Sequence, residues 1–191
     1  MARQKSDEKR SAILAAAAKV YAQRGLDDAP TSAISRLAEV AEGTLFTYVK
    51  TKDDLLNALY RELKLELAEV MMSNFSRKKS VRSRMQHAWD GFINWGLANP
   101  LQRRALAQIE VSDRLTPESR QAGAVPFAGI EITAQDAFAQ NLFADISLEF
   151  IAASMRALAD ATMNYIAQHP KQADHYRKAG FDLLWNGITR K

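Results

Sequence analysis

The sequence predicts an all-α fold, and three observations lead to that prediction. Apolar residues recur at spacings of three and four along most of the chain, which is the period of a helix that buries one face. Alanine, leucine, glutamine and arginine, which favour helices, are common. No Asn-Gly or Asp-Gly turn joins two alternating runs, so the signal for a β-hairpin is missing. We therefore expect about nine helices in the 191 residues.

The composition narrows the possible classes of protein. Hydrophobic residues make up 47% of the chain and charged residues 25%, which is ordinary for a folded globular protein. A net charge of +4 permits nucleic-acid binding but does not require it. The chain has no cysteine, which excludes disulfides and thiolate catalysis. Because it shows neither a long apolar run nor a signal-peptide pattern, we expect a cytoplasmic protein with no membrane partner.

The first expected helix runs from Ser6 to Arg24. Apolar residues such as Ile13, Val20 and Tyr21 form its buried stripe, and Gly25 is typical of a helix end.

Two short helices joined by a tight turn are expected between residues 31 and 49. Thr31 or Ser32 can cap the first of them with a side-chain hydroxyl. The expected buried residues are Ile34, Leu37 and Ala38 in the first helix and Leu45, Phe46 and Val49 in the second.

The outer face of the second short helix is unusual for a surface helix. It carries small hydroxyl side chains and a tyrosine, and its residues are Glu42, Gly43, Thr44, Thr47 and Tyr48. Such side chains suit a helix in the major groove of DNA, which is how a helix-turn-helix uses its second helix. An ordinary helical hairpin inside a larger bundle fits the periodicity equally well.

A longer pattern favours the DNA-binding interpretation. The stretch from Gly43 to Leu56, Gly-Thr-Leu-Phe-Thr-Tyr-Val-Lys-Thr-Lys-Asp-Asp-Leu-Leu, follows Val40-Ala41-Glu42. It resembles the DNA-binding domain of the TetR (tetracycline-repressor) family of transcription regulators, over about residues 10–60. Glu39 stands where that family usually has glycine, and Val49 replaces a more usual phenylalanine.

The resemblance implies a division into a DNA-binding domain, residues 1–51, and an effector-binding and dimerisation domain, residues 52–191. Lys50 and Lys52 flank the start of the next helix, where phosphate contacts are favoured. The predicted DNA-binding set is Thr31, Ser32, Glu42, Gly43, Thr44, Thr47, Tyr48, Lys50 and Lys52.

A long helix is expected to begin at Lys52. Thr51 and Asp54 resemble a capping box, and one apolar face continues from Leu55 to Met71 for five turns. Because this helix would connect the two domains, its tilt could carry a signal between them. The basic run that follows, Arg77, Lys78, Lys79, Arg82 and Arg84, is interpreted as a solvated loop and helix start.

Further helices are expected over residues 81–98, 101–115, from 117 onward, and 131–145. Aromatic residues beside small ones, with a segment broken by glycine and proline at 123–130, indicate a pocket for a mostly apolar effector. The predicted ligand-binding set is Trp89, Phe92, Trp95, Phe127, Phe138, Phe143 and Glu110. The alternative is that each aromatic side chain simply fills the core.

Two alanine-rich helices are expected to close the chain, from residue 146 to 168 and beyond His169-Pro170. The family resemblance implies that they pair with their mates as a four-helix dimer interface. The predicted interface residues are Ala152, Met155, Ala159, Phe181, Trp185 and Ile188.

No motif indicates catalysis, a cofactor or a metal. The three histidines lack the spacing of metal ligands, and no glycine-rich phosphate-binding loop or nucleophile motif is present. The first hypothesis is a homodimeric, ligand-responsive repressor that binds an inverted-repeat operator in double-stranded DNA. The alternatives are a helical ligand-binding or adaptor protein that no longer binds DNA and, with least support, a helical-bundle enzyme.

Overall fold

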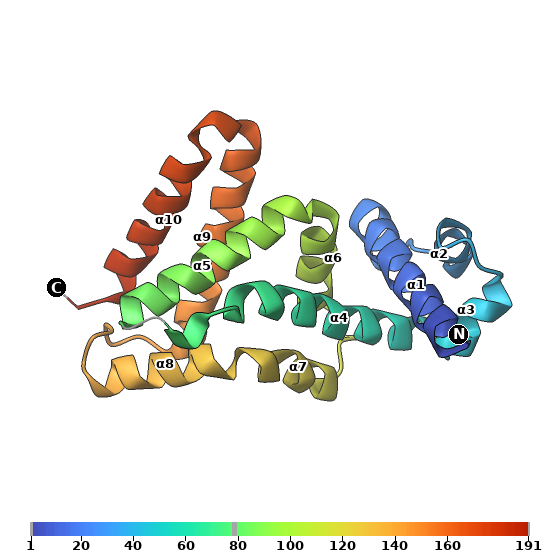
Figure 1. Cartoon of the computed structure of the whole chain (residues 1–191), viewed down its shortest axis with the longest axis horizontal. Helices are drawn as coiled ribbons and strands as arrows, with labels where there is room; N and C mark the ends of the chain where they lie inside the picture. Colours follow the sequence, from blue (N-terminus) through green and yellow to red (C-terminus); the bar gives the residue numbers. More distant parts are fainter. Residues whose placement is uncertain (1, 78–79, 191) are drawn as a thin grey trace. The chain divides into compact units, whose positions relative to one another are not determined.

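A computed structural model of the chain describes residues 2–77 and 80–190. Within that part the prediction of an all-α fold is confirmed, because the only β-type pairing is an isolated bridge between Phe143 and Thr189. Figure 1 follows the elements in chain order. They are α1 (Ala2–Arg24), α2 (Thr31–Leu37), α3 (Glu42–Tyr48), α4 (Lys52–Met72), η1 (Phe75–Arg77), α5 (Val81–Ala98), α6 (Pro100–Glu110), α7 (Pro117–Ala124), η2 (Val125–Phe127), α8 (Ala128–Ala139), α9 (Leu148–Gln168), η3 (Pro170–Gln172) and α10 (Ala173–Ile188). None of the described helices has the length and hydropathy needed to cross a membrane.

The chain forms two compact units, each built from two segments. The first comprises Met1–Glu66 and Asn99–Val125, and the second comprises Leu67–Ala98 and Pro126–Lys191. In the first unit α1 packs against both α2 and α6, so the three-helix head shares its core with later helices. The predicted division of roles at residues 51 and 52 stays a prediction, since the packing groups α6 and α7 with the head.

The core of the first unit corrects two expectations about the short helices. Ile34 and Leu45 are fully buried as expected, but 48% of Leu37 and 43% of Phe46 is exposed. Leu45 of α3 and the C-cap residue Val49 are both buried, while Phe46 lies about 100° further round the helix than Leu45. Leu37 is the last residue of α2, where the chain turns away.

Some helix ends agree with those expected from the sequence, and others differ from them. Thr51 and Asp54 form the expected capping box, with two reciprocal side-chain hydrogen bonds of 3.0 Å. Pro30, rather than Thr31 or Ser32, is the N-cap of α2, and it makes no side-chain cap. Helix α1 begins at Ala2, earlier than the expected Ser6.

Helix α8 stops six residues before the expected residue 145. Asn141 lies in the left-handed region at φ 54, and the amides of Asn141 and Leu142 donate back to the carbonyls of Phe138 and Ala137. This is the Schellman pattern that ends a helix. Phe143 therefore lies beyond α8, in the bridge to Thr189.

The second unit is organised around α5, which packs against α8, α9 and α10. Trp89 is fully buried, and its indole N–H donates to the carbonyl of Arg177 at 3.0 Å. The approach of α10 to this ring requires a glycine, because a Cβ on Gly180 would lie 2.5 Å from Thr162 Oγ1 and 2.8 Å from the Trp89 ring. Helices α9 and α10 pack against each other and complete the core.

Candidate functional site

Helices α2 and α3 form a helix-turn-helix whose turn has a defined hydrogen-bond pattern. The amide of Val40 donates to the carbonyl of Ser35 at 3.0 Å, and the amide of Glu39 donates to Arg36 at 3.2 Å. This Schellman turn places Glu39 at φ 55, in the left-handed region where glycine is favoured. The expectation that Glu39 occupies a position suited to glycine is thereby confirmed.

The structure places the whole predicted DNA-binding set in the first unit, on or next to this motif. Ser32, Glu42, Gly43, Thr47 and Lys50 are exposed. The remaining members, Thr31, Thr44, Tyr48 and Lys52, are half-buried. Their role in binding DNA stays a prediction.

Several of these polar groups already have partners inside the protein. The Thr31 hydroxyl donates to Glu42 Oε1 at 2.7 Å, which joins the start of α2 to the start of α3. The Thr47 hydroxyl donates to the carbonyl of Gly43 at 3.1 Å. Lys52 Nζ donates to the carbonyl of Asp27 at 2.9 Å and so fastens the turn before α2. The first two bonds fix the side chains of Glu42 and Thr47 on the outer face of α3.

Gly43 and Phe46 are the most informative residues of that face. A Cβ built on Gly43 meets no atom within 4 Å, and Gly43 does not have a positive φ. The fold therefore does not require glycine at this position. Phe46 is a large apolar side chain left 43% exposed. Phe46 was expected to be buried, although its place directly after the buried Leu45 was a usable signal that it lies nearer the surface.

A polar network around the buried Asn57 joins α4 and the turn before α2 to the segment between α6 and α7 in the first unit. Asn57 on α4 donates to the carbonyls of Asp53 and Arg114 and accepts from the amide of Thr116. Arg114 forms ion pairs with Asp27 at 3.3 Å and Asp53 at 3.7 Å.

Tyr21 on α1 lies beside this network. Its side chain is fully buried, and its hydroxyl has no partner among the described residues. Burial raises the pKa of Tyr21 to about 12, partly opposed by the positive charge of Arg114.

The predicted ligand-binding residues lie mostly in closed packing. Trp89, Trp95 and Phe143 are at most 3% exposed, and Phe138 meets Phe143 edge to face at a centroid distance of 5.2 Å. Phe92 and Phe127 are half-buried. Glu110 belongs to the first unit and faces Lys64 Nζ at 3.4 Å. This arrangement favours the core interpretation of the aromatic set.

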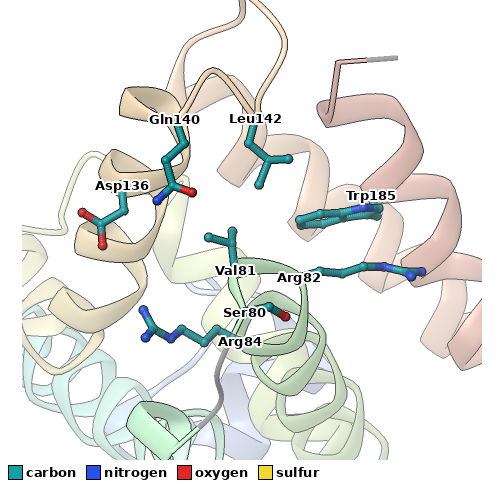
Figure 2. Close-up of a pocket in the computed structure, with 8 residues that line it drawn as sticks. All are labelled: Ser80, Val81, Arg82, Arg84, Asp136, Gln140, Leu142 and Trp185. Carbon is teal, nitrogen blue, oxygen red and sulfur yellow. The ribbon is translucent and has the colours of Figure 1, made fainter.

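A half-open cleft of about 440 Å³ lies elsewhere in the second unit, at the start of α5. Figure 2 shows it between α5, the end of α8 and Trp185 of α10. Two members of the basic run that was expected to be solvated, Arg82 and Arg84, line this cleft, and Arg84 is half-buried. Lys78, Lys79 and the Arg77 side chain lie outside the described residues.

The predicted dimer-interface residues divide into two groups. Ala159, Phe181 and Ile188 are at most 4% exposed and belong to the core of their own unit, so they cannot lie on an outer contact face. Ala152, Met155 and Trp185 are half-buried. The large apolar residues that are exposed on α9 and α10 are instead Phe150, Tyr165 and Leu183, at 61%, 41% and 66%.

The described residues contain no group of three histidine or acidic side chains placed to hold a metal ion.

Comparison with known proteins gives the same assignment for the head. Residues 13–59 match the family model described as bacterial regulatory proteins, tetR family. A curated relative, the fatty acid metabolism regulator protein of Bacillus subtilis (strain 168), is 32% identical over 73 residues. That match spans 38% of this chain and 38% of the relative's length.

Solved structures resemble the chain over nearly its full length. A candidate tetR family transcription regulator from Shewanella sp. PV-4 is 26% identical, with a TM-score of 0.84 over 96% of this chain and 99% of that one. A TetR family transcription regulator from Marinobacter aquaeolei VT8 shares the fold at 21% identity, with a TM-score of 0.91 over 99% and 100%. FadR from Bacillus subtilis, solved in complex with stearoyl-CoA, shares it at 18% identity, with a TM-score of 0.69 over 93% and 98%. The head of the chain thus carries the helix-turn-helix of the tetR family, and the whole chain shares the all-helical fold of TetR family transcription regulators.

Proposed function

We propose that this protein is a homodimeric repressor that binds an inverted-repeat operator through α3 and releases it when a small effector binds. The observation that carries the proposal is the outer face of α3, where Glu42, Gly43 and Thr47 are exposed to solvent. A helix with small hydroxyl side chains fits the major groove, where they contact base edges or phosphates.

Gly43 and Phe46 add detail to that proposal. Because the fold leaves the space at Gly43 empty, a DNA backbone can approach the start of α3 closely. Phe46 offers an apolar surface for a thymine methyl group or a sugar. In a two-fold dimer, two such helices would read half-sites with centres about 34–36 Å apart.

The dimer contact is proposed on the outer faces of α9 and α10. Phe150, Ala153, Ala157 and Ala161 follow one another at helical spacing along the exposed side of α9, and Leu183 is exposed on α10. Small side chains let two helices approach closely, and the exposed apolar side chains gain free energy when they are covered.

The effector is proposed to be a small molecule with an apolar body. FadR was solved with stearoyl-CoA, which makes fatty acyl compounds the first class to test. Helix α4 contributes residues to both units, so a ligand that prefers one position of this helix could shift the equilibrium between DNA-binding and released states.

The first test is the selection of bound duplexes from a random-sequence library, followed by anisotropy titrations at two salt concentrations. We expect an inverted repeat to be enriched. Thr47→Ala and Tyr48→Phe should each weaken binding to this repeat by about 1–3 kcal/mol and leave binding to random DNA unchanged. Lys50→Ala should weaken binding to all sequences. It should also make the slope of log K against log salt concentration shallower by about one.

A helical ligand-binding protein without DNA binding is the alternative function. The internal bonds of Thr47 and Lys52 favour it, because they occupy groups that DNA would need. An absence of any enriched sequence, with a folded dimer in the same preparation, would establish this alternative.

A further inference from the structure

Lys52, at the start of α4, has a neutral hydrogen-bond partner although two acidic residues adjoin it. Its Nζ donates to the backbone carbonyl of Asp27 at 2.9 Å. The carboxylate of Asp27 belongs to the same residue as that carbonyl, and Asp53 is the next residue along α4. An ammonium group has three N–H donors, so the bond to Asp27 leaves two of them for a further acceptor.

The two carboxylates are held instead by Arg114, which lies between α6 and α7. Its guanidinium pairs with Asp27 Oδ1 at 3.3 Å through one nitrogen and with Asp53 Oδ1 at 3.7 Å through the other. A guanidinium presents five donors in a fixed fork and can therefore serve two acids at once. Asp54, the other acid in the first turn of α4, accepts from the amide of Thr51 in the capping box.

The backbone of Arg114 is fixed on both sides of its side chain. Its carbonyl accepts from Nδ2 of the buried Asn57 at 3.0 Å, and its amide donates to Ser112 Oγ at 3.2 Å. Asn57 also accepts from the amide of Thr116 at 2.9 Å. Because the main chain is held, the Arg114 side chain loses less conformational entropy on pairing than a side chain on a mobile loop would lose.

The charges at this place balance only while Arg114 is present. Lys52 and Arg114 are positive, and Asp27 and Asp53 are negative. The two acidic side chains are 95% and 57% exposed, so packing does not prevent them from turning towards Lys52. Without Arg114, one ammonium group would face two carboxylates. A phosphate that approaches Lys52 would then meet a cation that is already paired, beside acids that repel it.

We propose that Arg114 is a positioning residue for DNA binding, which holds the carboxylates of Asp27 and Asp53 away from Lys52 and so keeps its ammonium group available to a DNA phosphate. This role rests on the proposed function, because it takes Lys52 as a phosphate contact. The alternative is a pair of ordinary surface ion pairs, which contribute little to stability and nothing to DNA binding.

The first test measures DNA affinity by anisotropy at several salt concentrations. Arg114→Gln should weaken binding to the selected operator and to random DNA alike, by about five- to tenfold, and make the slope of log K against log salt concentration shallower by about one. Arg120→Gln is the matched control, because Arg120 donates to the backbone carbonyls of Glu110 and Ser112 instead of to carboxylates. Its affinity should stay within about twofold of the parent's. Equal losses in both variants, or no loss in Arg114→Gln, overturn the role of Arg114.

The second test asks whether Arg114 acts through Lys52. Lys52→Ala should weaken DNA binding of the parent by about five- to tenfold, but it should weaken binding of Arg114→Gln by less than about twofold, because Lys52 is already occupied there. Two losses that simply add would mean that Arg114 acts independently of Lys52, and this overturns the proposal. Urea denaturation establishes that each variant is folded. Arg114→Lys, which keeps the charge but not the fork, replaces Arg114→Gln in these comparisons if the latter is unfolded.

The third test restores the charge balance. Asp27→Asn with Asp53→Asn, added to Arg114→Gln, should return the affinity to within about twofold of the parent's. Asp28→Asn with Asp113→Asn is the matched control, since it removes the same charge from two exposed acids that neighbour the ion-pair sites in sequence, and it should not restore binding. Equal restoration by both pairs, or by neither, contradicts a specific role for the paired carboxylates.

The last test needs no DNA. A crystal structure of Arg114→Gln should show a carboxylate oxygen of Asp27 or Asp53 within about 4 Å of Lys52 Nζ, the distance of an ion pair. Carboxylates that stay turned away from Lys52 overturn the proposal. If the parent protein binds no DNA, the proposed function fails, and this structure still decides whether Arg114 keeps the two acids from Lys52.

Discussion

The backbone amide of Glu39 donates to the carbonyl of Arg36 at 3.2 Å while Glu39 itself lies at φ 55. The bond is part of the turn that sets α3 against α2, so the backbone of Glu39 cannot relax without loss of the turn. A residue with a Cβ is strained in the left-handed region, and glycine is not. The helix-turn-helix therefore contains a strained residue at its centre.

Replacing Glu39 with glycine should relieve this strain. We expect Glu39→Gly to raise the free energy of unfolding by up to about 1 kcal/mol, because part of the relief is offset by the greater entropy of the unfolded chain. Urea denaturation measures the change. Glu39→Ala is the control, since it removes the carboxylate but keeps the Cβ and should bring no comparable gain. A less stable glycine variant would mean that the turn is not strained.

Gly43 allows stability and DNA binding to be separated. A Cβ at this position meets nothing within 4 Å, and alanine is a better helix former by about 1 kcal/mol. Gly43→Ala should therefore leave the protein equally or more stable while it weakens operator binding, because the methyl group occupies the space left for DNA. Thermal unfolding and anisotropy on the same preparation measure both effects. Undiminished operator affinity in the variant would remove Gly43 from the proposed contact.

The backbone was easier to predict from the sequence than the site. Thr51 and Asp54 are three residues apart and cap the same helix, so their role depends on local sequence alone. Glu39 was also predictable, because a tight turn between two helices needs one left-handed residue. The end of α8 was not, since the left-handed Asn141 has no pattern around it that distinguishes it from a helical asparagine.

The aromatic residues show why the ligand site was harder to predict. Periodicity identifies the buried side of a helix, and both core and pocket residues lie on that side. Trp89 was predicted to line a pocket, but α10 packs directly against it at Gly180, which no local pattern reveals. Arg84 appeared to be a solvated member of a basic run because its position depends on α8, about 50 residues later.

Tyr21 should make the stability of the protein fall at alkaline pH. Burial raises its pKa from 10.0 to about 12, so the folded state keeps the phenol proton more firmly than the unfolded state. The corresponding stability is fully present below pH 10 and is lost as the pH rises towards 12, by roughly 2–3 kcal/mol in all. Urea denaturation of Tyr21→Phe and the parent at pH 8 and pH 11.5 measures this difference.

The two proteins share every other titrating group, so the comparison isolates Tyr21. At pH 8 the variant should be as stable as the parent or slightly more stable, because the Tyr21 hydroxyl has no partner among the described residues. At pH 11.5 the variant should be clearly the more stable of the two. A parallel loss of stability in both proteins would mean that the Tyr21 phenol ionises as easily in the folded state as in the unfolded one.

The dimer proposal predicts different results for two alanines on the same helix. Ala157 is exposed on the outer stripe of α9, and Ala159 is fully buried in its own unit. Ala157→Glu should keep the protomer folded but weaken the dimer at least about tenfold, because it brings two like charges together across a two-fold axis. Ala159→Glu should instead destabilise the protomer itself, because a carboxylate would enter the core.

Ala167→Glu, the same substitution at an exposed position of α9 off the stripe, is the control for added charge. Sedimentation at several concentrations measures association, and thermal unfolding measures the protomer. If Ala157→Glu dissociates over the same range of concentration as the parent, the interface lies away from this face of α9.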